Sequence, residues 1–344
     1  MSPSPQSTPP VTVAVLGAGT WGITLADILA QNGHRVRCWD IDAGLIDLLG
    51  RERRHPKLTD FVIDPAVSLT ADLRAAFAEA TVCVLVVPSK AMRSALSTLK
   101  EVGLAAQIQG WVLCTKGIEP GSLMLMHEVL ADVLGAEAGA RAGVLSGPSH
   151  AEEVSRRLPT TVVASSADPA LAEAIQRWFF RPWLRVYTVG DMAGVELGGS
   201  LKNVIAIAAG LSDGMGFGDN TRAALMTRGL AEIVRLGLAA GARLETFMGL
   251  SGIGDLIVTA GSGLSRNHNF GRLLAEGLSC EDALKKVGMV VEGYTTAESA
   301  WQLARKYKVD MPITEVVHRI LYEGLSPRQG VEELLARDPK PERY

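Results

Sequence analysis

The chain has 344 residues, of which 47% are hydrophobic and 21% are charged, and its formal net charge is −3. This length suggests two or three domains, and the composition excludes a chain that is disordered as a whole. The charge is nearly balanced and forms no basic stripe, which argues against nucleic acid as a partner.

The N-terminus and the cysteines bear on the cellular compartment. Residues 1–10 (MSPSPQSTPP) hold no apolar segment, so we expect a disordered tail there rather than a signal peptide. No apolar run approaches the roughly 18 residues of a membrane span. The four cysteines form no C-x-x-C pair or disulfide framework, and the six histidines show no metal-ligand spacing. We therefore expect a cytoplasmic protein with reduced thiols, no membrane span and no metal site.

A glycine-rich turn follows the first predicted strand. Residues 11–16 (VTVAVL) read as a buried strand, residues 17–22 (GAGTWG) give the pattern G-x-G-x-x-G, and an apolar-periodic helix follows. A second predicted strand, 35–39, ends at Asp40, 18 residues after the last glycine. This order is the fingerprint of dinucleotide binding, in which the glycines let the backbone approach the pyrophosphate at the helix N-terminus. The glycines concerned are Gly17, Gly19 and Gly22.

Asp40 bears on the choice between NAD and NADP. Its carboxylate would accept a hydrogen bond from the adenosine ribose 2′-hydroxyl and would repel a 2′-phosphate, which favours NAD. Arginines near it in the sequence keep NADP open as the alternative; they are Arg35, Arg37, Arg51, Arg53 and Arg54.

Strand and helix signals alternate up to about residue 190. We predict helices over 44–57, 89–100 and 168–179, and strands over 81–87, 111–115, 144–145, 160–165 and 185–189. Such alternation indicates an α/β fold with a doubly wound, mostly parallel sheet of the Rossmann type, covered by helices on both faces. Ligands bind beyond the carboxyl ends of the strands in such sheets. Lys116, Gly147 and Ser149 fall at such ends, so we expect them in the ligand site.

Beyond residue 190, helical periodicity replaces the strand signals. The predicted helices cover 192–210, 221–240, 267–276, 281–287, 294–308, 312–323 and 327–336. We therefore predict a dinucleotide-binding Rossmann domain over 11–192 and an all-helical substrate-binding and catalytic domain over 193–344.

One predicted helix holds polar residues in apolar surroundings. Residues 204–209 (VIAIAA) are apolar on every face, which indicates a buried helix, yet Lys202 and Asn203 come directly before them. A lysine is almost never buried without a partner, because burying an ammonium costs several kcal/mol unless it is paired or loses its proton. Lys202 therefore either reaches the surface or a structural carboxylate, or has a pKa lowered from about 10.4 toward neutrality and exchanges a proton with a substrate.

A carboxylate occurs in a second apolar segment, 249–259 (GLSGIGDLIVT). Asp255 can stay ionised in such surroundings only when a cation is near, and Lys202 is the predicted partner. A purely structural ion pair is the alternative.

A hydroxyl, a guanidinium and a carboxamide stand together before the predicted helix 267–276. They belong to Ser265, Arg266 and Asn267, and such groups at a helix N-terminus bind phosphate. The alternative is a surface helix cap with a solvated arginine.

Eight segments together are specific to a family. In chain order they are GAGTWG, VVPS, CTKGIE, SGPSHAEE, LGGSLKNVIAIAAGLSDGMGFGDN, GLSGIGDLIVT, SRNHNFG and VVEGY. The sequence resembles, from residue 11 to about 335, the bacterial-type NAD(P)-dependent glycerol-3-phosphate dehydrogenases. The resemblance implies interconversion of sn-glycerol 3-phosphate and dihydroxyacetone phosphate, and supply of the former to glycerophospholipid synthesis.

The resemblance also implies a role for each matching residue. It places the general acid/base on Lys202. Substrate contacts fall on Lys116, Gly147, Ser149, Lys202, Asp255, Ser265, Arg266 and Asn267. Cofactor contacts fall on Thr20, Trp21, Asp40, Ile41, Lys116, Ala151, Arg266, Val290 and Glu292, beside the glycine turn.

The residues and the resemblance together give a hypothesis for the mechanism. Hydride passes between the nicotinamide C4 and the substrate C2, while Lys202 takes or returns the hydroxyl proton. Lys116 and Asn203 polarise the carbonyl oxygen, and Asp255 with Thr259 orients Lys202. We also expect the apolar helical domain to form a homodimer.

Two other functions fit parts of the pattern. A dehydrogenase of the same plan that acts on a 3-hydroxy acid or an acyl-CoA would use a His–Glu pair, for which His150 with Glu152 or Glu153 is the local candidate. The Ser-Arg-Asn anion site favours a small phosphorylated substrate instead. A redox sensor without turnover would have no need of a buried proton carrier such as Lys202.

Overall fold

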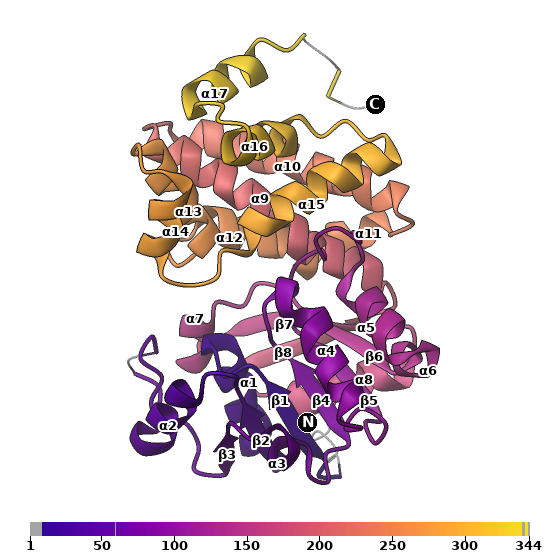
Figure 1. Cartoon of the computed structure of the whole chain (residues 1–344). Helices are drawn as coiled ribbons and strands as arrows, with labels where there is room; N and C mark the ends of the chain where they lie inside the picture. Colours follow the sequence, from indigo (N-terminus) through magenta and orange to yellow (C-terminus); the bar gives the residue numbers. More distant parts are fainter. Residues whose placement is uncertain (1–8, 59, 339–340, 343–344) are drawn as a thin grey trace.

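The computed structural model describes residues 9–58, 60–338 and 341–342. Residues 1–8 of the tail expected over 1–10 lie outside the described residues. Figure 1 shows two parts, a sheet flanked by helices and, above it, a part built from helices, with the sequence passing once from the first to the second.

Eight strands form one sheet in the order β3-β2-β1-β4-β5-β6-β7-β8. They are β1 (Thr12–Leu16), β2 (Arg35–Trp39), β3 (Val67–Thr70), β4 (Val82–Leu85), β5 (Gly110–Leu113), β6 (Ala142–Ser146), β7 (Thr160–Ser166) and β8 (Leu184–Val189). The strand order reverses between β1 and β4, which are parallel neighbours. In a doubly wound sheet this reversal opens a crevice at the carboxyl ends of the two strands, where a dinucleotide binds. The predicted fold class is confirmed.

Helices cover both faces of the sheet. Alternate side chains of β1 belong to separate apolar clusters, Val13 and Val15 to one and Ala14 and Leu16 to the other, as the two-residue period of a strand requires. The helices of this part are α1 (Thr20–Gln31), α2 (Ala43–Glu52), α3 (Leu73–Phe77), the 3₁₀ turn η1 (Ser89–Ala91), α4 (Met92–Glu101), α5 (Met126–Leu134), α6 (Ala136–Ala140), α7 (Ala151–Ser155) and α8 (Pro169–Phe179).

One strand pair departs from the parallel arrangement. β7 runs antiparallel to β6, and β8 is parallel to β7. A parallel crossover needs a connection that can span the sheet, usually a full helix. Residues 147–159 contain only the short helix α7, so the chain returns along β6 in the opposite direction.

Several elements of this part differ from the sequence prediction. The strand β3 and the helices α3, α5, α6 and α7 were not predicted. The helix predicted over 44–57 ends at Glu52, because Arg53 adopts a left-handed conformation and its guanidinium donates hydrogen bonds to the carbonyl oxygens of Asp64 and Val67. The basic end of the prediction therefore forms a loop.

The second part contains no strand among the described residues. Its helices are α9 (Met192–Gly214), α10 (Asp219–Ala239), α11 (Leu244–Phe247), the π-helical turn η2 (Leu250–Gly254), α12 (Asp255–Gly261), α13 (Arg266–Ala275), α14 (Cys280–Val287), α15 (Glu292–Tyr307), α16 (Pro312–Tyr322) and α17 (Pro327–Leu335). All seven predicted helices are present, and α11, η2 and α12 were missed. The boundary between residues 192 and 193 stays a prediction.

The helix α9 is the centre of the helical part, and other helices surround it (Figure 1). Its residues Val204, Ile205, Ala206 and Ile207 are at most 1% exposed, as the apolar pattern predicts. The backbones of α9 and α13 meet directly: a Cβ at Gly210 would lie 1.9 Å from the backbone oxygen of His268. Only glycine permits this approach, so α13 is fixed against α9.

No single helix in the described part of the chain is long and apolar enough to cross a membrane. Residues 244–261 and 266–275 satisfy the length and composition criteria only as a bent pair.

Candidate functional site

The lysine of α9 is buried and paired. Lys202 is 5% exposed, and its Nζ lies 2.5 Å from Oδ1 of Asp255 and 2.6 Å from Oγ1 of Thr259. Asp255 begins α12 and Thr259 lies one turn later, so both face α9 from the same side of their helix. The predicted pair Lys202–Asp255 is confirmed.

A second lysine reaches the same carboxylate from the sheet. Lys116 follows β5, and its Nζ lies 2.7 Å from Oδ2 of Asp255 and 3.0 Å from the carbonyl oxygen of Gly147, which follows β6. The hydroxyl of Ser149 donates to the same carbonyl oxygen over 2.9 Å. The two strand ends selected from the sequence therefore meet the helical part at Asp255.

Burial and the shared charges act in opposite directions on the pKa values of Lys202 and Asp255. Burial lowers the pKa of Lys202 to about 7; the carboxylate of Asp255 opposes this shift and the ammonium of Lys116 adds to it. Burial would raise the pKa of Asp255, but the ammonium groups of Lys116 and Lys202 outweigh burial and hold it below its usual range. Asp255 is therefore paired with two amines, one from the sheet and one from α9.

The start of α13 lies beside these residues. Ser265 is the N-cap, and its hydroxyl accepts a hydrogen bond from the backbone N–H of His268 over 3.2 Å. The side-chain Nδ2 of Asn267 donates to Oδ1 of Asn203 over 2.9 Å, and Oδ1 of Asn267 accepts from the backbone N–H of Gly293 over 2.8 Å. Asn203 follows Lys202, so the predicted phosphate group adjoins the lysine cluster.

The glycine turn fits a dinucleotide. Gly17 has a φ of 108°, and a Cβ there would lie 2.8 Å from the carbonyl oxygen of Val86. Gly19 is the N-cap of α1 and supplies no side chain, so no side-chain hydrogen bond caps the first turn of that helix. A pyrophosphate can therefore come close to the backbone of the turn and bind at the N-terminus of α1.

Asp40 lies at the end of β2 beside this turn. Its Oδ2 accepts a hydrogen bond from the backbone N–H of Ala18 over 2.7 Å, and its Oδ1 accepts one from Asp42 over 3.0 Å. Asp40 thus fixes the glycine turn, a role that the sequence did not indicate. Each carboxylate oxygen retains a lone pair for a ribose hydroxyl.

The remaining predicted cofactor residues are spread over several elements. Thr20 and Trp21 begin α1, Ala151 begins α7, Ile41 is 85% exposed after β2, and Val290 is 39% exposed before α15. Glu292, the first residue of α15, accepts hydrogen bonds from the backbone N–H and the hydroxyl of Ser89 over 3.1 and 2.6 Å.

The alternative His–Glu pair is not formed. His150 is the N-cap residue of α7, and its buried ring Nε2 has no hydrogen-bond partner among the described residues. Burial, followed by the ammonium of Lys202, lowers the pKa of His150. A neutral imidazole without a carboxylate partner lacks the arrangement that this alternative needs.

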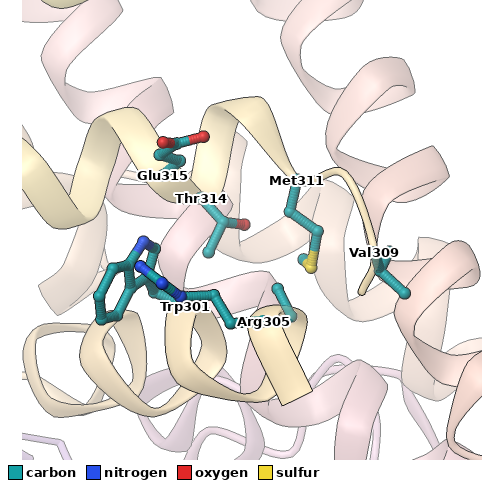
Figure 2. Close-up of a pocket in the computed structure, with 7 residues that line it drawn as sticks. Trp301, Arg305, Val309, Met311, Thr314 and Glu315 are labelled. Atoms are coloured by element: carbon teal, nitrogen blue, oxygen red, sulfur yellow. The ribbon is translucent and has the colours of Figure 1, made fainter. Parts of the chain in front are cut away.

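Two cavities in the helical part lie apart from the predicted site. One of about 140 Å³ lies between α15 and α16, where Figure 2 shows the guanidinium of Arg305 over the ring of Trp301. The other, about 550 Å³, is lined mainly by apolar side chains of α9, α10, α16 and α17, together with charged residues such as Glu232 and Arg235 of α10. None of the residues lining either cavity belongs to the predicted site.

Comparison with known proteins identifies the family. Sequence models of the NAD-dependent glycerol-3-phosphate dehydrogenase N-terminus and C-terminus match residues 12–172 and 191–332. The chain belongs to this family of dehydrogenases. Glycerol-3-phosphate dehydrogenase [NAD(P)+] of Carboxydothermus hydrogenoformans is 48% identical over 96% of this chain and 98% of its own, and that of Geobacter sulfurreducens is 49% identical over 96% and 99%.

A solved structure of the family agrees. Glycerol-3-phosphate dehydrogenase from Coxiella burnetii superposes with a TM-score of 0.90 at 39% identity, covering 95% of this chain and 99% of that one. The Rossmann-type sheet and the helical second part are therefore those of glycerol-3-phosphate dehydrogenases.

Sequence analysis missed Ser89 as a site residue. It follows β4, whose carboxyl end borders the crevice next to β1. The rule that selected Lys116 and Gly147 at strand ends would also have selected Ser89.

Proposed function

We propose that the chain catalyses reversible hydride transfer between NADH or NADPH and dihydroxyacetone phosphate, forming sn-glycerol 3-phosphate for glycerophospholipid synthesis. The observation that carries the proposal is the buried pair of Lys202 and Asp255, joined by the partly exposed Lys116, next to the N-terminus of α13. Membership of the glycerol-3-phosphate dehydrogenase family supports it.

Lys202 is the proposed proton carrier. An ammonium has three N–H donors, and Asp255 and Thr259 accept two of them. The third position is where a proton passes to or from the substrate oxygen. With a pKa near 7, Lys202 can release this proton in one direction of the reaction and receive it in the other.

Lys116 stabilises the developing alkoxide in this proposal. Two of its N–H groups go to Asp255 and Gly147, so one remains for the substrate oxygen. Asn203 has a smaller share in this step, because its Oδ1 accepts from Asn267 and its Nδ2 donates to the carbonyl oxygen of Gly199, which leaves one N–H.

The substrate phosphate is proposed to bind at the start of α13. The backbone N–H groups there, the guanidinium of Arg266 and the hydroxyl of Ser265 supply donors for an anion. Holding the phosphate fixes the reacting carbon relative to Lys202, so remote binding energy supports the chemical step.

The cofactor supplies or accepts the hydride when it is bound. The glycine turn from Gly17 to Gly22 and the first turn of α1 would hold its pyrophosphate. Asp40 would hold the adenosine ribose, and we propose that its charge favours NAD over NADP.

Three further proposals complete the description. The boundary between the cofactor-binding and catalytic domains lies at residues 192 and 193, and the protein acts in the cytoplasm. The protein forms a homodimer through the helical part, whose apolar groove along α10, α16 and α17 offers a surface for association. Light scattering during gel filtration measures the mass: a dimer supports the last proposal and a monomer refutes it.

The absorbance of the reduced cofactor at 340 nm tests the reaction. Purified protein with dihydroxyacetone phosphate should oxidise NADH, with a lower kcat/KM for NADPH. Asp40→Asn keeps an acceptor for Ala18 but removes the charge, so it should raise kcat/KM for NADPH relative to NADH. Absence of oxidation with either cofactor, while the cofactor still binds, would refute the substrate assignment.

A further inference from the structure

Three segments that are distant in sequence meet at Ser89. The residue is 1% exposed, and both its backbone N–H and its hydroxyl donate to the carboxylate of Glu292. Ser89 belongs to the sheet part and Glu292 to the helical part, so this contact joins the two. Burial raises the pKa of Glu292, and the two bonds from Ser89 and the charges of Arg266 and Lys90 oppose that shift.

Gly117 packs against the same contact from the loop after β5. A Cβ at Gly117 would lie 2.4 Å from Cβ and 2.6 Å from Oγ of Ser89, and 3.2 Å from a carboxylate oxygen of Glu292. The φ of Gly117 is not positive, so this glycine is required by the close approach and not by a turn. Lys116, which binds Asp255, is the preceding residue.

These contacts close a ring of neighbours around the site. On one side Lys116 and Lys202 share Asp255. On the other side Asn203, which follows Lys202, binds Asn267.

The ring continues from Asn267 into the sheet part. Asn267 accepts from the backbone N–H of Gly293, and the adjacent Glu292 binds Ser89. Ser89 lies against Gly117, which returns the ring to the lysine before it.

We propose that Ser89 is a positioning residue for the reaction: its bonds to Glu292, packed under Gly117, fix the two lysines and Asn267 relative to one another. This inference rests on the proposed function. Ser89 reaches the reacting atoms only through Glu292 and through the loop that carries Lys116.

Ser89→Ala tests the proposal, because it removes the hydroxyl donor and keeps the backbone N–H. A hydrogen bond to a carboxylate is strong enough for about a tenfold to hundredfold effect. We expect kcat/KM for NADH to fall by about that factor, with the KM for dihydroxyacetone phosphate changed less than threefold. Ser94→Ala is the matched control, since that exposed hydroxyl donates only to the carbonyl oxygen of Ala91 on the same segment.

A double-mutant cycle separates this role from general packing. If Ser89 acts through Glu292, then Ser89→Ala has less than a twofold effect on kcat/KM for NADH in a Glu292→Ala background. Gly117→Ala should impair the enzyme at least as much as Ser89→Ala. In the double variant Ser89→Gly with Gly117→Ala, the new methyl group fills the space of the removed serine side chain, and the hydrogen bond to Glu292 stays absent. Its kcat/KM for NADH should therefore equal that of Ser89→Gly alone.

The dissociation constant of NADH, from tryptophan fluorescence, is a readout that does not need turnover. It should rise about tenfold in Ser89→Ala, because Glu292, a cofactor contact in the proposed function, loses the hydroxyl donor that fixes its carboxylate. The proposal is overturned if Ser89→Ala behaves like Ser94→Ala in both measurements, or if its full effect persists without Glu292. A wild type that binds NADH but turns over no substrate would refute the proposed function. The same double-mutant cycle, measured with the dissociation constant of NADH, would still test the role of Ser89.

Discussion

Replacing Lys202 with methionine tests the centre of the proposed mechanism. Methionine has a similar volume and no charge, so it fills the space between α9 and α12 without a proton to exchange. The change leaves Asp255 paired with Lys116 through its other oxygen, which keeps the buried carboxylate compensated. The fold should therefore survive, while the proton carrier is lost.

The expected loss follows from the site. General acid–base catalysis contributes about 10²- to 10⁴-fold, which corresponds to about 3 to 5 kcal/mol of barrier at 1.36 kcal/mol per factor of ten. Stability responds to two opposing terms. The variant loses the hydrogen bonds from Lys202 to Asp255 and Thr259, at about 1–3 kcal/mol for each group left unsatisfied, and it no longer buries an ammonium.

The assay is the oxidation of NADH at 340 nm with dihydroxyacetone phosphate, together with the dissociation constant of NADH. We expect kcat to fall at least a hundredfold with NADH binding changed less than threefold. Lys286→Met, at an exposed position of α14, is the matched control and should retain full activity. A Lys202→Met enzyme with more than a tenth of the wild-type kcat would refute the acid–base role.

Three further predictions concern Lys202, Arg266 and Glu232, a buried carboxylate of α10 outside the site that accepts hydrogen bonds from Ile313 and Thr314. Because burial lowers the pKa of Lys202 to about 7, kcat for ketone reduction should be constant at lower pH and fall as pH rises through 7, while kcat for oxidation rises over that range; identical profiles in both directions would contradict this assignment. Arg266→Gln should raise the KM for dihydroxyacetone phosphate at least tenfold and leave the slow turnover of unphosphorylated dihydroxyacetone unchanged. The control Arg272→Gln, on the same helix, should leave both unchanged. Equal losses with both substrates would show that Arg266 does not bind the phosphate. Burial raises the pKa of Glu232 from 4.5 to about 7, so between these values the folded chain binds more protons than the unfolded chain and the free energy of unfolding should fall with rising pH. Urea titrations should show a flatter dependence in Glu232→Gln than in the wild type or in the exposed control Glu315→Gln, and an unchanged slope would show that Glu232 does not titrate in this range.

Much of the site could be predicted because its residues violate simple local rules. A lysine in an all-apolar helix and a carboxylate in an apolar segment each need a partner, and the structure joins Lys202 to Asp255. Strand ends placed Lys116 and Gly147 in the site, because the carboxyl ends of parallel strands share one edge. These signals depend on local sequence and on fold class, and both are readable from one chain.

The parts that could not be predicted depend on contacts between distant segments. The antiparallel direction of β7 follows from the short length of α7, and Asp255 lies on a helix whose glycine-rich approach obscured its periodicity. The second role of Asp40, holding the amide of Ala18, depends on how the side chain folds back across the turn. Ser89 follows a strand end, as Lys116 does, but its contacts with Glu292 and Gly117 join segments that are distant in sequence, so the sequence does not show them.

The direct backbone contact between α9 and α13 fixes the distance between these two helices. Any side chain at Gly210 would collide with the carbonyl oxygen of His268, so a residue other than glycine would push the two helices apart. Because Lys202 lies on α9, the distance between its amine and the first turn of α13 is therefore set by the packing of these two helices. With the phosphate bound at α13 as we propose, a phosphorylated ketone with one more carbon between phosphate and carbonyl would place its carbonyl away from the amine of Lys202. In the proposed function, the selection of a three-carbon substrate would then depend on Gly210, a residue outside the proposed substrate contacts.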